Sequence, residues 1–360
     1  MVVYIESLER TEAVARLSRR PFDGRSGAYG FSWGAGYSRP MTRHVVFVHT
    51  DRRQLLPALV AIHSLRSRGG NEGAFDVRLL QQHRTELDER RDGQPYRARG
   101  DAVWDHAHPS AFHYLRRWVP ELVGYRGRAL VIDPDVFAVG SILPLLESDM
   151  GGKALLCRYH PNGYADDGRP IHSTGVMLLD CAKLTHWRWH DEIADLFAGR
   201  LDYWDMLQLA NEPKENIGDL DERWNAMDTL TAETRLLHFT RLSTQPWATG
   251  LPLPHDRYDP TAPIPEASWW QRRLGIRPQR RCRRHPDAAQ EKLFLDLLAE
   301  CLEHGLLSEA FVRAELRAGH LRRDIFQMLG QSGYRLGRAT GQRLLDELGI
   351  APPVGATRTT

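Results

Sequence analysis

Long apolar runs, strong net charge and paired cysteine motifs are all absent from this chain of 360 residues. No apolar run could cross a bilayer, and charges interrupt the amino-terminal stretch where a secretory signal would be apolar, so we expect a cytoplasmic protein. The formal net charge is only +2, which predicts no general attraction to nucleic acid. The four cysteines include no Cys-x-x-Cys spacing, which indicates reduced packing residues and not a zinc site or a disulfide framework.

Short apolar runs alternate with amphipathic segments from residue 45 onward. This alternation predicts an α/β fold with a mainly parallel sheet flanked by helices. The predicted strands are residues 45–48, 75–80, 129–132, 153–157 and 176–179, and the predicted helices are 52–66, 111–118 and 181–197. We expect Trp187 and Trp189, in the last of these helices, to serve packing.

The composition changes near residues 40 and 255, which suggests three regions. Residues 1–40 form an amino-terminal extension, and residues 41–255 form the α/β domain. Residues 256–360 begin with a proline-rich linker and continue as a helical region, with helices predicted at 288–304, 308–318 and 321–329.

Two carboxylates stand at the end of the strand 129–132, in the motif Asp133-Pro134-Asp135. Positions i and i+2 of an extended backbone point to the same side, and the proline restricts the motif further. Such a pair, at the carboxyl end of a strand, predicts a hard divalent cation with a phosphate behind it. A solvated turn or a helix cap is the alternative interpretation.

A second apolar run ends at His238 and supports the metal interpretation. Imidazole would complete the carboxylate pair and favour Mn²⁺, with Mg²⁺ as the alternative ion. The alternative is that His238 is an ordinary polar residue whose hydrogen bonds are satisfied inside the fold.

These motifs, in this order, resemble the retaining family 8 glycosyltransferases and their bacterial relatives, which have the GT-A (Rossmann-like) fold. The matching segments are 44–51, 112–120, Asp133-Pro134-Asp135, 173–180, Trp224-Asn225, and His238 followed by Pro246-Trp247. The resemblance covers roughly residues 44–250. It implies transfer of a sugar, with retention of configuration, from a nucleoside diphosphate sugar, expected to be a UDP-sugar, to an acceptor.

The resemblance also implies roles for particular residues. The metal ligands would be Asp133, Asp135 and His238, and the catalytic candidates on the acceptor side are Asp205 and Gln208. The donor would contact His49, Thr50, Asp51, Arg116, Ser173, Thr174, Arg241 and Trp247, the last through its backbone.

Three positions depart from the family pattern. Gln245 stands where the family usually has a phosphate-neutralising lysine, so Arg241 is a candidate for that charge. Ser173 stands where the family usually has asparagine, and Asp205 with Gln208 match the family's Asp-Gln pair only loosely. These changes leave the sugar and the acceptor open, and the acceptor could be a glycan, a lipid, a protein or a small molecule.

Two functions other than sugar transfer are also compatible with parts of the sequence. A catalytically silent nucleotide-sugar or carbohydrate-binding protein would explain the altered sugar-side residues. A metal-dependent phosphohydrolase also uses Asp-x-Asp, but on the first strand and commonly followed by Thr, whereas Val136 follows here.

An arginine cluster at residues 272–284 is the remaining charged feature. A solvated basic loop is one interpretation, and a docking patch for an anionic surface is the other. No RNA-binding motif accompanies it.

Overall fold

The computed structural model describes residues 44–71, 73–164, 170–253, 273 and 279–351. The predicted extension 1–40 and both predicted region boundaries, near residues 40 and 255, lie outside these residues. The three-region division therefore stays a prediction.

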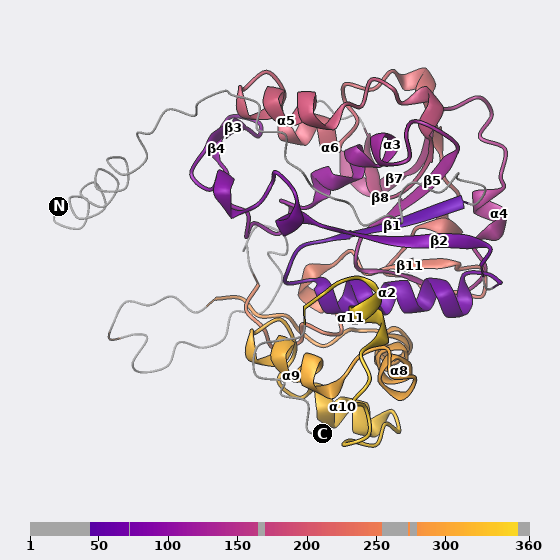
Figure 1. Cartoon of the computed structure of the whole chain (residues 1–360), viewed down its shortest axis with the longest axis vertical. Coiled ribbons are helices and arrows are strands. Elements are labelled where there is room, and N and C mark those ends of the chain that lie inside the picture. The colour runs from indigo at the N-terminus through magenta and orange to yellow at the C-terminus, as the bar shows by residue number, and fades with distance from the viewer. Residues whose placement is uncertain (1–43, 72, 165–169, 254–272, 274–278, 352–360) are drawn as a thin grey trace. The chain divides into compact units, whose positions relative to one another are not determined.

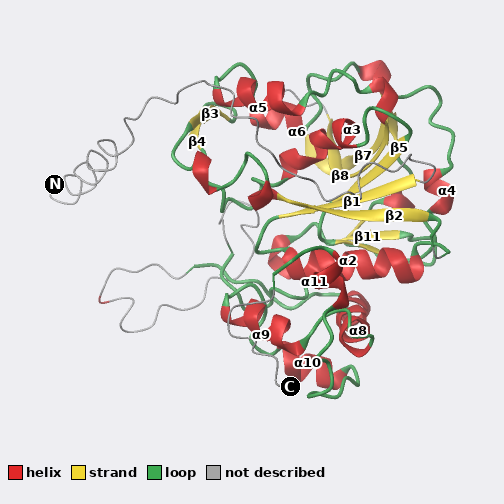
Figure 2. Ribbon diagram, viewed as in Figure 1, coloured by secondary structure: helices red, strands yellow, loops and turns green. Residues whose placement is uncertain are grey.

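A six-stranded sheet forms the centre of the α/β domain (Figures 1 and 2). Its order is β2 (Phe75–Gln81), β1 (His44–Thr50), β5 (Arg128–Ile132), β8 (Pro170–Asp180), β7 (Leu155–Tyr164) and β9 (Ile217–Asp219). Strand β1 is parallel to β2 and β5, and β7 is parallel to β9, whereas β8 is antiparallel to both of its neighbours. The predicted mainly parallel α/β fold is confirmed. The antiparallel direction of β8 was not predicted. It arises because β7 and β8 are consecutive strands that pair with each other as a hairpin.

Alternate residues of the central strands enter two separate cores. One face, covered by α2 (Leu55–Arg68), contributes Val46, Val48, Leu130, Ile132, Val176 and Leu178. The other face, covered by α3 (Val119–Leu122), α5 (Trp189–Phe197) and α6 (Tyr203–Leu207), contributes Val45, Phe47, Ala129, Val131, Met177 and Leu179. This period of two, with both faces apolar, explains why the strands read as continuous apolar runs in the sequence.

Helix α2 is buried on both sides from Leu55 to Leu65, although the sequence predicted only one apolar face. The second cover is α8 (Ala288–Glu303), which packs on α2 and joins it through His63 Nε2, 2.8 Å from Glu300 Oε2. The further carboxyl-terminal helices are α9 (Glu309–Arg317), α10 (Ile325–Gln331) and α11 (Arg343–Glu347). The three predicted helices of this region are confirmed, and the structure has one further helix, α11, that was not predicted.

Two predicted helices differ in form. The segment 111–118 is mainly a 3₁₀ helix, His113–Trp118, that continues into α3, and the α-helix predicted at 181–197 begins only at Trp189. Arg188 is extended, with φ −111° and ψ 103°, so that Trp187 and Trp189 both reach the core. A continuous helix would place residues i and i+2 on different faces. The predicted packing role of both tryptophans is confirmed.

The four cysteines are all buried and unpaired, as predicted. Among the described helices, none combines the length and the apolar character needed to cross a membrane.

Candidate metal and donor site

A small second sheet brings His238 to the Asp133-Pro134-Asp135 turn. Strand β6 (Val136–Ala138) follows the turn directly and pairs antiparallel with β11 (Leu236–His238), so that His238 lies opposite Val136. The backbone N–H of Phe239 donates to the Asp135 carbonyl at 3.0 Å. Side chains about a hundred residues apart in sequence are thereby held at the carboxyl end of β5.

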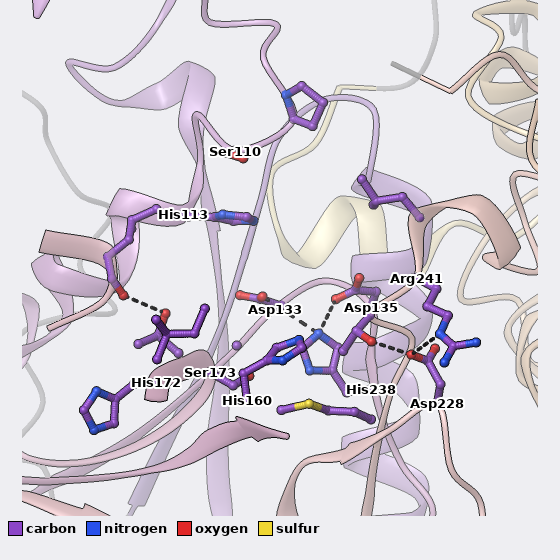
Figure 3. A pocket seen from close by; sticks show the side chains of 18 of the residues that line it. Ser110, His113, Asp133, Asp135, His160, His172, Ser173, Asp228, His238 and Arg241 are labelled. Atoms are coloured by element: carbon purple, nitrogen blue, oxygen red, sulfur yellow. Dashed lines mark hydrogen bonds and ion pairs between the residues drawn. The ribbon is translucent and has the colours of Figure 1, made fainter. Parts of the chain in front are cut away.

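Asp133, Asp135 and His238 form one buried group (Figure 3). Each offers a ligand atom within 4.8 Å of the other two, and the residues are only 8%, 7% and 5% exposed. His238 Nε2 lies 3.4 Å from Asp135 Oδ1 and 4.0 Å from Asp133 Oδ2. The prediction that these three side chains converge is met by the geometry; that they bind a metal stays a prediction.

Asn225 orients the His238 ring. Its Oδ1 lies 2.8 Å from His238 Nδ1, and since a carbonyl oxygen can only accept, Nδ1 must donate. The Asn225 Nδ2 in turn donates to Ser173 Oγ at 3.3 Å. Nε2 is therefore the nitrogen presented to the carboxylates, the arrangement that metal-binding histidines adopt.

The two carboxylates have different electrostatic surroundings. Burial would raise the pKa of Asp133, but Arg116 and His49 outweigh it and hold that pKa well below its usual value. Arg116 donates to Asp133 Oδ1 at 2.8 Å, and His49 Nε2 lies 2.7 Å from the same oxygen. Burial raises the pKa of Asp135, and the Asp133 charge adds to that effect. Two such carboxylates side by side are stabilised by a shared cation.

Burial acts to lower the pKa of His238, but the two neighbouring carboxylates outweigh it and raise the pKa above its usual value. The two carboxylates thus favour a proton on the imidazole. A cation at this place would displace that proton.

Asp135 and Gly175 show that the group fits a cation. Asp135 Oδ2 accepts from Gln245 Nε2 at 2.9 Å, whereas Asp135 Oδ1 has no hydrogen-bond partner among the described residues, although it is buried. A Cβ on Gly175 would lie 2.4 Å from His238 Cε1 and 2.8 Å from Asp133 Oδ2, so only glycine leaves the room that both side chains need. Two carboxylates and one imidazole suit Mn²⁺, and Mg²⁺ less well.

A cavity of about 920 Å³ opens over the group (Figure 3). Five residues predicted to bind the donor or to act in catalysis line it: Arg116, Ser173, Thr174, Gln208 and Arg241. Arg116 also bonds to the Thr174 hydroxyl, so its guanidinium is already shared between Thr174 and Asp133.

The other predicted residues lie elsewhere. His49 is buried behind Asp133, and the Thr50 hydroxyl donates to the Asp51 carbonyl. Asp51 and Trp247 line an adjoining cavity of about 570 Å³, which shares Gln54, Pro109 and Leu242 with the first. Asp205 is exposed on α6 and is not among the residues that line either cavity, so its catalytic role stays a prediction without support from the geometry.

Asp228 was not predicted from the sequence. It lines the large cavity and adopts φ 49°, a left-handed conformation that costs an aspartate energy. Its Oδ2 accepts from the Thr240 hydroxyl and lies 3.8 Å from Arg241 Nε, and its buried Oδ1 has no partner among the described residues (Figure 3). No motif in the sequence marks this position.

Arg283, a member of the predicted arginine cluster, is exposed and lines the same cavity. Its backbone N–H donates to the Ser243 carbonyl at 2.7 Å, which fixes the segment beside the metal group. By contrast, Arg281 donates to the Gly250 carbonyl and Arg284 to Glu291. Arg272 and Arg277 lie outside the described residues, and the predicted anionic docking surface stays a prediction.

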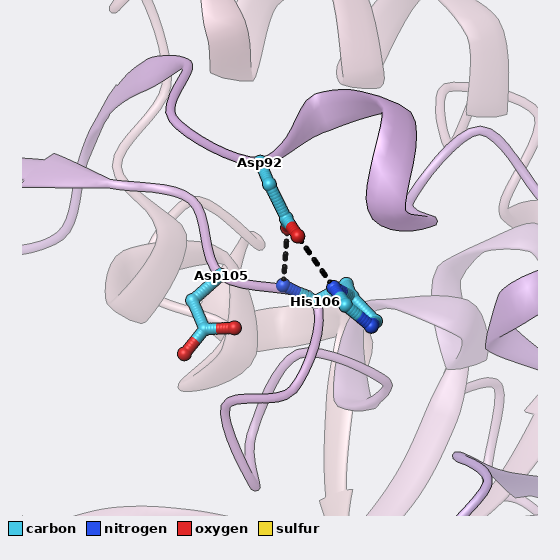
Figure 4. A group of neighbouring side chains, drawn as sticks. All are labelled: Asp92, Asp105 and His106. Atoms are coloured by element: carbon cyan, nitrogen blue, oxygen red, sulfur yellow. Dashed lines mark hydrogen bonds and ion pairs between the residues drawn. The ribbon is translucent and has the colours of Figure 1, made fainter. Parts of the chain in front are cut away.

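A second acid-histidine group, Asp92, Asp105 and His106, lies near the surface (Figure 4). Asp92 accepts from the backbone N–H of His106 at 2.8 Å and lies 2.6 Å from its Nδ1, and Asp105 accepts from the Ala107 N–H. These bonds close an exposed turn and satisfy its members, so the group supports no metal site.

No family model and no curated protein sequence matches this chain. Similar solved structures include the glycosyltransferase GlyE of Streptococcus pneumoniae TIGR4, with 20% identity over 57% of this chain and 56% of that one, at a TM-score of 0.40. The bifunctional glycosyltransferase WbbM gives 16% identity, 59% and 48% coverage and a TM-score of 0.42. The galactosyltransferase LgtC, solved with donor and acceptor sugar analogues, has 18% identity over 57% of this chain and 89% of that one, at a TM-score of 0.38. The chain matches about half the length of GlyE and of WbbM, and these similarities assign no activity, donor or acceptor to it.

Proposed function

We propose that this protein is a metal-dependent glycosyltransferase that moves a sugar from a nucleoside diphosphate sugar, expected to be a UDP-sugar, to an acceptor. The observation that carries the proposal is the buried Asp133, Asp135 and His238 group, which lines a cavity of about 920 Å³. The family resemblance of the sequence supplies the reaction class and the expectation that configuration is retained. When bound at this group, Mn²⁺ would stabilise the charge that develops on a departing diphosphate.

The diphosphate would lie between the metal group and two arginines. Arg241 and Arg283 both line the cavity and both are well exposed to it, whereas Arg116 is held by Asp133 and Thr174. Gln245, at the position of the family's lysine, donates to Asp135 and so orients a ligand carboxylate. In this proposal the phosphate charge is met by Arg241, which lies 3.8 Å from Asp228, and by Arg283.

The nucleoside would occupy the adjoining cavity of about 570 Å³. Asp51 and Gln54 contribute from the loop after β1, and His320 contributes from the loop after α9. The loop carrying Asp51 is held because Asp51 Oδ1 accepts from the Gln54 N–H at 2.8 Å. The carboxyl-terminal helical region would thus form part of the donor site.

The sugar and the acceptor would meet near Ser173, Thr174, Gln208 and Asp228. Ser173 and Thr174 are held by Asn225 and by the Leu207 carbonyl, so their positions are fixed before a ligand arrives. Among the described residues, Asp228 is the carboxylate beyond the metal pair that lines the cavity, and we assign to it the removal of a proton from the acceptor hydroxyl.

A thermal-shift panel of UDP-, GDP-, ADP- and TDP-sugars, each with Mn²⁺ and with a chelator, tests the proposal. One nucleotide class should stabilise the protein only with metal, and Asp135→Ala should abolish this shift while the surface variant Asp296→Ala keeps it. Stabilisation without transfer to any acceptor would favour a silent binding protein. A folded protein that no donor stabilises, with or without metal, would contradict the proposal.

A further inference from the structure

A third cavity, of about 710 Å³, lies beside the proposed transfer cavity and is walled by aromatic rings. Its walls come from α6 and from a hairpin of β3 (Pro95–Arg97) and β4 (Asp101–Val103). Four rings line it: Tyr96, Trp104, Tyr203 and Trp204. The ring of Tyr203 stands edge-on to the other three, at centroid distances of 5.6–6.2 Å, so the wall is rigid.

The charged groups of this cavity are one cation and one anion, beside the imidazole of His108. Arg99 and Asp105 line it with opposite charges. Trp104 is 3% exposed, and its Nε1 donor has no hydrogen-bond partner among the described residues. A buried donor without a partner is costly. The lining therefore suits a neutral ligand with apolar faces and hydroxyl groups.

The cavity borders the transfer site at α6. Trp204 lines both cavities, and Arg99 Nη2 donates at 2.9 Å to Gln208 Oε1, whose side chain lines the transfer cavity. Arg99 has φ 56°, a left-handed conformation that strains an arginine, and its N–H donates to Asp202 at 2.6 Å. Such strain persists where surrounding contacts hold a residue for a purpose. Here the contacts hold the hairpin against the helix that borders the transfer site.

We propose that this aromatic cavity binds a neutral saccharide unit of the acceptor. The partly exposed rings of Tyr96 and Trp204 can stack on the apolar C–H faces of a sugar ring, whereas Trp104 and Tyr203 are buried, and a cavity of this size has room for such a unit. The reacting hydroxyl of the same acceptor would reach past Trp204 toward Asp228. The inference rests on the proposed function, because it names the acceptor class of that reaction.

The test uses the full chain on an array of neutral and acidic glycans, with blocking variants. Ala102→Trp places bulk at a residue that lines the cavity, and Asp101→Trp places the same bulk at the preceding position, which is exposed and not among the lining residues. Val103→Trp, at a lining residue that is already 64% exposed, is a second blocking variant that the fold should tolerate. Thermal melting verifies that each variant is folded.

We expect wild type and Asp101→Trp to retain neutral glycans, and both blocking variants to lose binding at least tenfold. Stabilisation by UDP with Mn²⁺ should be the same in all four proteins. Absence of any bound glycan, a preference for acidic glycans, or binding that survives both blocking variants would overturn the inference. If none of the UDP-, GDP-, ADP- and TDP-sugars stabilises the protein with Mn²⁺ while neutral glycans bind as expected, the proposed transferase function fails and the saccharide site stands.

Discussion

Asn225→Leu should weaken metal binding without removing any ligand. The substitution keeps the side-chain size roughly and deletes the Oδ1 that accepts from His238 Nδ1 at 2.8 Å. Loss of such an orienting partner typically lowers metal affinity about 10- to 100-fold, which corresponds to about 1.4–2.7 kcal/mol. The stranded Nδ1–H, in a side chain that is 7% exposed, should also lower the free energy of unfolding by about 1–3 kcal/mol.

Calorimetric titration with Mn²⁺ measures the affinity, and urea unfolding measures the stability. Asn225→Asp keeps an oxygen that can accept from Nδ1, so it should retain most of the affinity. Asn211→Leu makes the same change at an exposed position that is not among the cavity-lining residues, and should alter neither quantity. Equal Mn²⁺ affinity in Asn225→Leu and wild type would refute the idea that His238 binds metal through Nε2.

Three further perturbations test the site and its support. Gly175→Ala should abolish Mn²⁺ binding, because the added Cβ would collide with His238 and Asp133. Gly330→Ala is the control, since a Cβ there meets no other atom, and its Mn²⁺ affinity in calorimetry should equal that of wild type. Mn²⁺ affinity should rise with pH, because a proton on His238 competes with the metal and the His238 pKa is raised by carboxylates that outweigh burial. Calorimetric titrations between pH 5.5 and 8.5 measure this, and an affinity that does not change with pH would contradict it. The stability of the metal-free protein should change with pH in the opposite direction. Because the His238 pKa is raised in the folded state, its contribution to the free energy of unfolding is present at low pH and is lost as pH rises through the folded pKa. Arg322→Met should lower the free energy of unfolding by about 1–3 kcal/mol, because Oε1 of the buried Glu291 loses its partner while Oε2 keeps Arg284. Adding Glu291→Leu should recover part of this loss in urea unfolding.

Local patterns made the sheet and the carboxylate pair predictable. The strand ending at Ile132 and the spacing of Asp133 and Asp135 depend only on neighbouring residues, and both appear as expected. The convergence of His238 needed the family resemblance, because it depends on β6 pairing with β11. No local pattern specifies that pairing.

Features set by distant contacts could not be predicted. Trp247 was expected to contact the donor through its backbone, and that stays a prediction. Its ring packs against Phe137, Phe239 and Phe294, the last from α8, which the sequence did not indicate. Its carbonyl accepts from the Arg322 N–H at 2.7 Å, so the carboxyl-terminal region holds the loop that carries Gln245. The sequence identified the helices of that region without showing what they touch.

The arginine cluster shows the same limit. A run of like charge predicts either a solvated loop or a binding patch, and the sequence alone cannot separate its members. In the structure Arg284 pairs with the buried Glu291, whereas Arg283 faces the metal cavity. One basic segment therefore contains both a structural ion pair and a candidate phosphate ligand.

Electron paramagnetic resonance of Mn²⁺ bound to the wild-type chain, recorded with and without UDP, tests the central claim most directly. We expect one bound ion per chain, at the Asp133, Asp135 and His238 group, and a changed spectrum when the diphosphate enters the metal's coordination sphere. Asp135→Ala should lose both signals. A folded wild-type protein that binds no Mn²⁺, or whose bound Mn²⁺ is unaffected by UDP, would contradict the account.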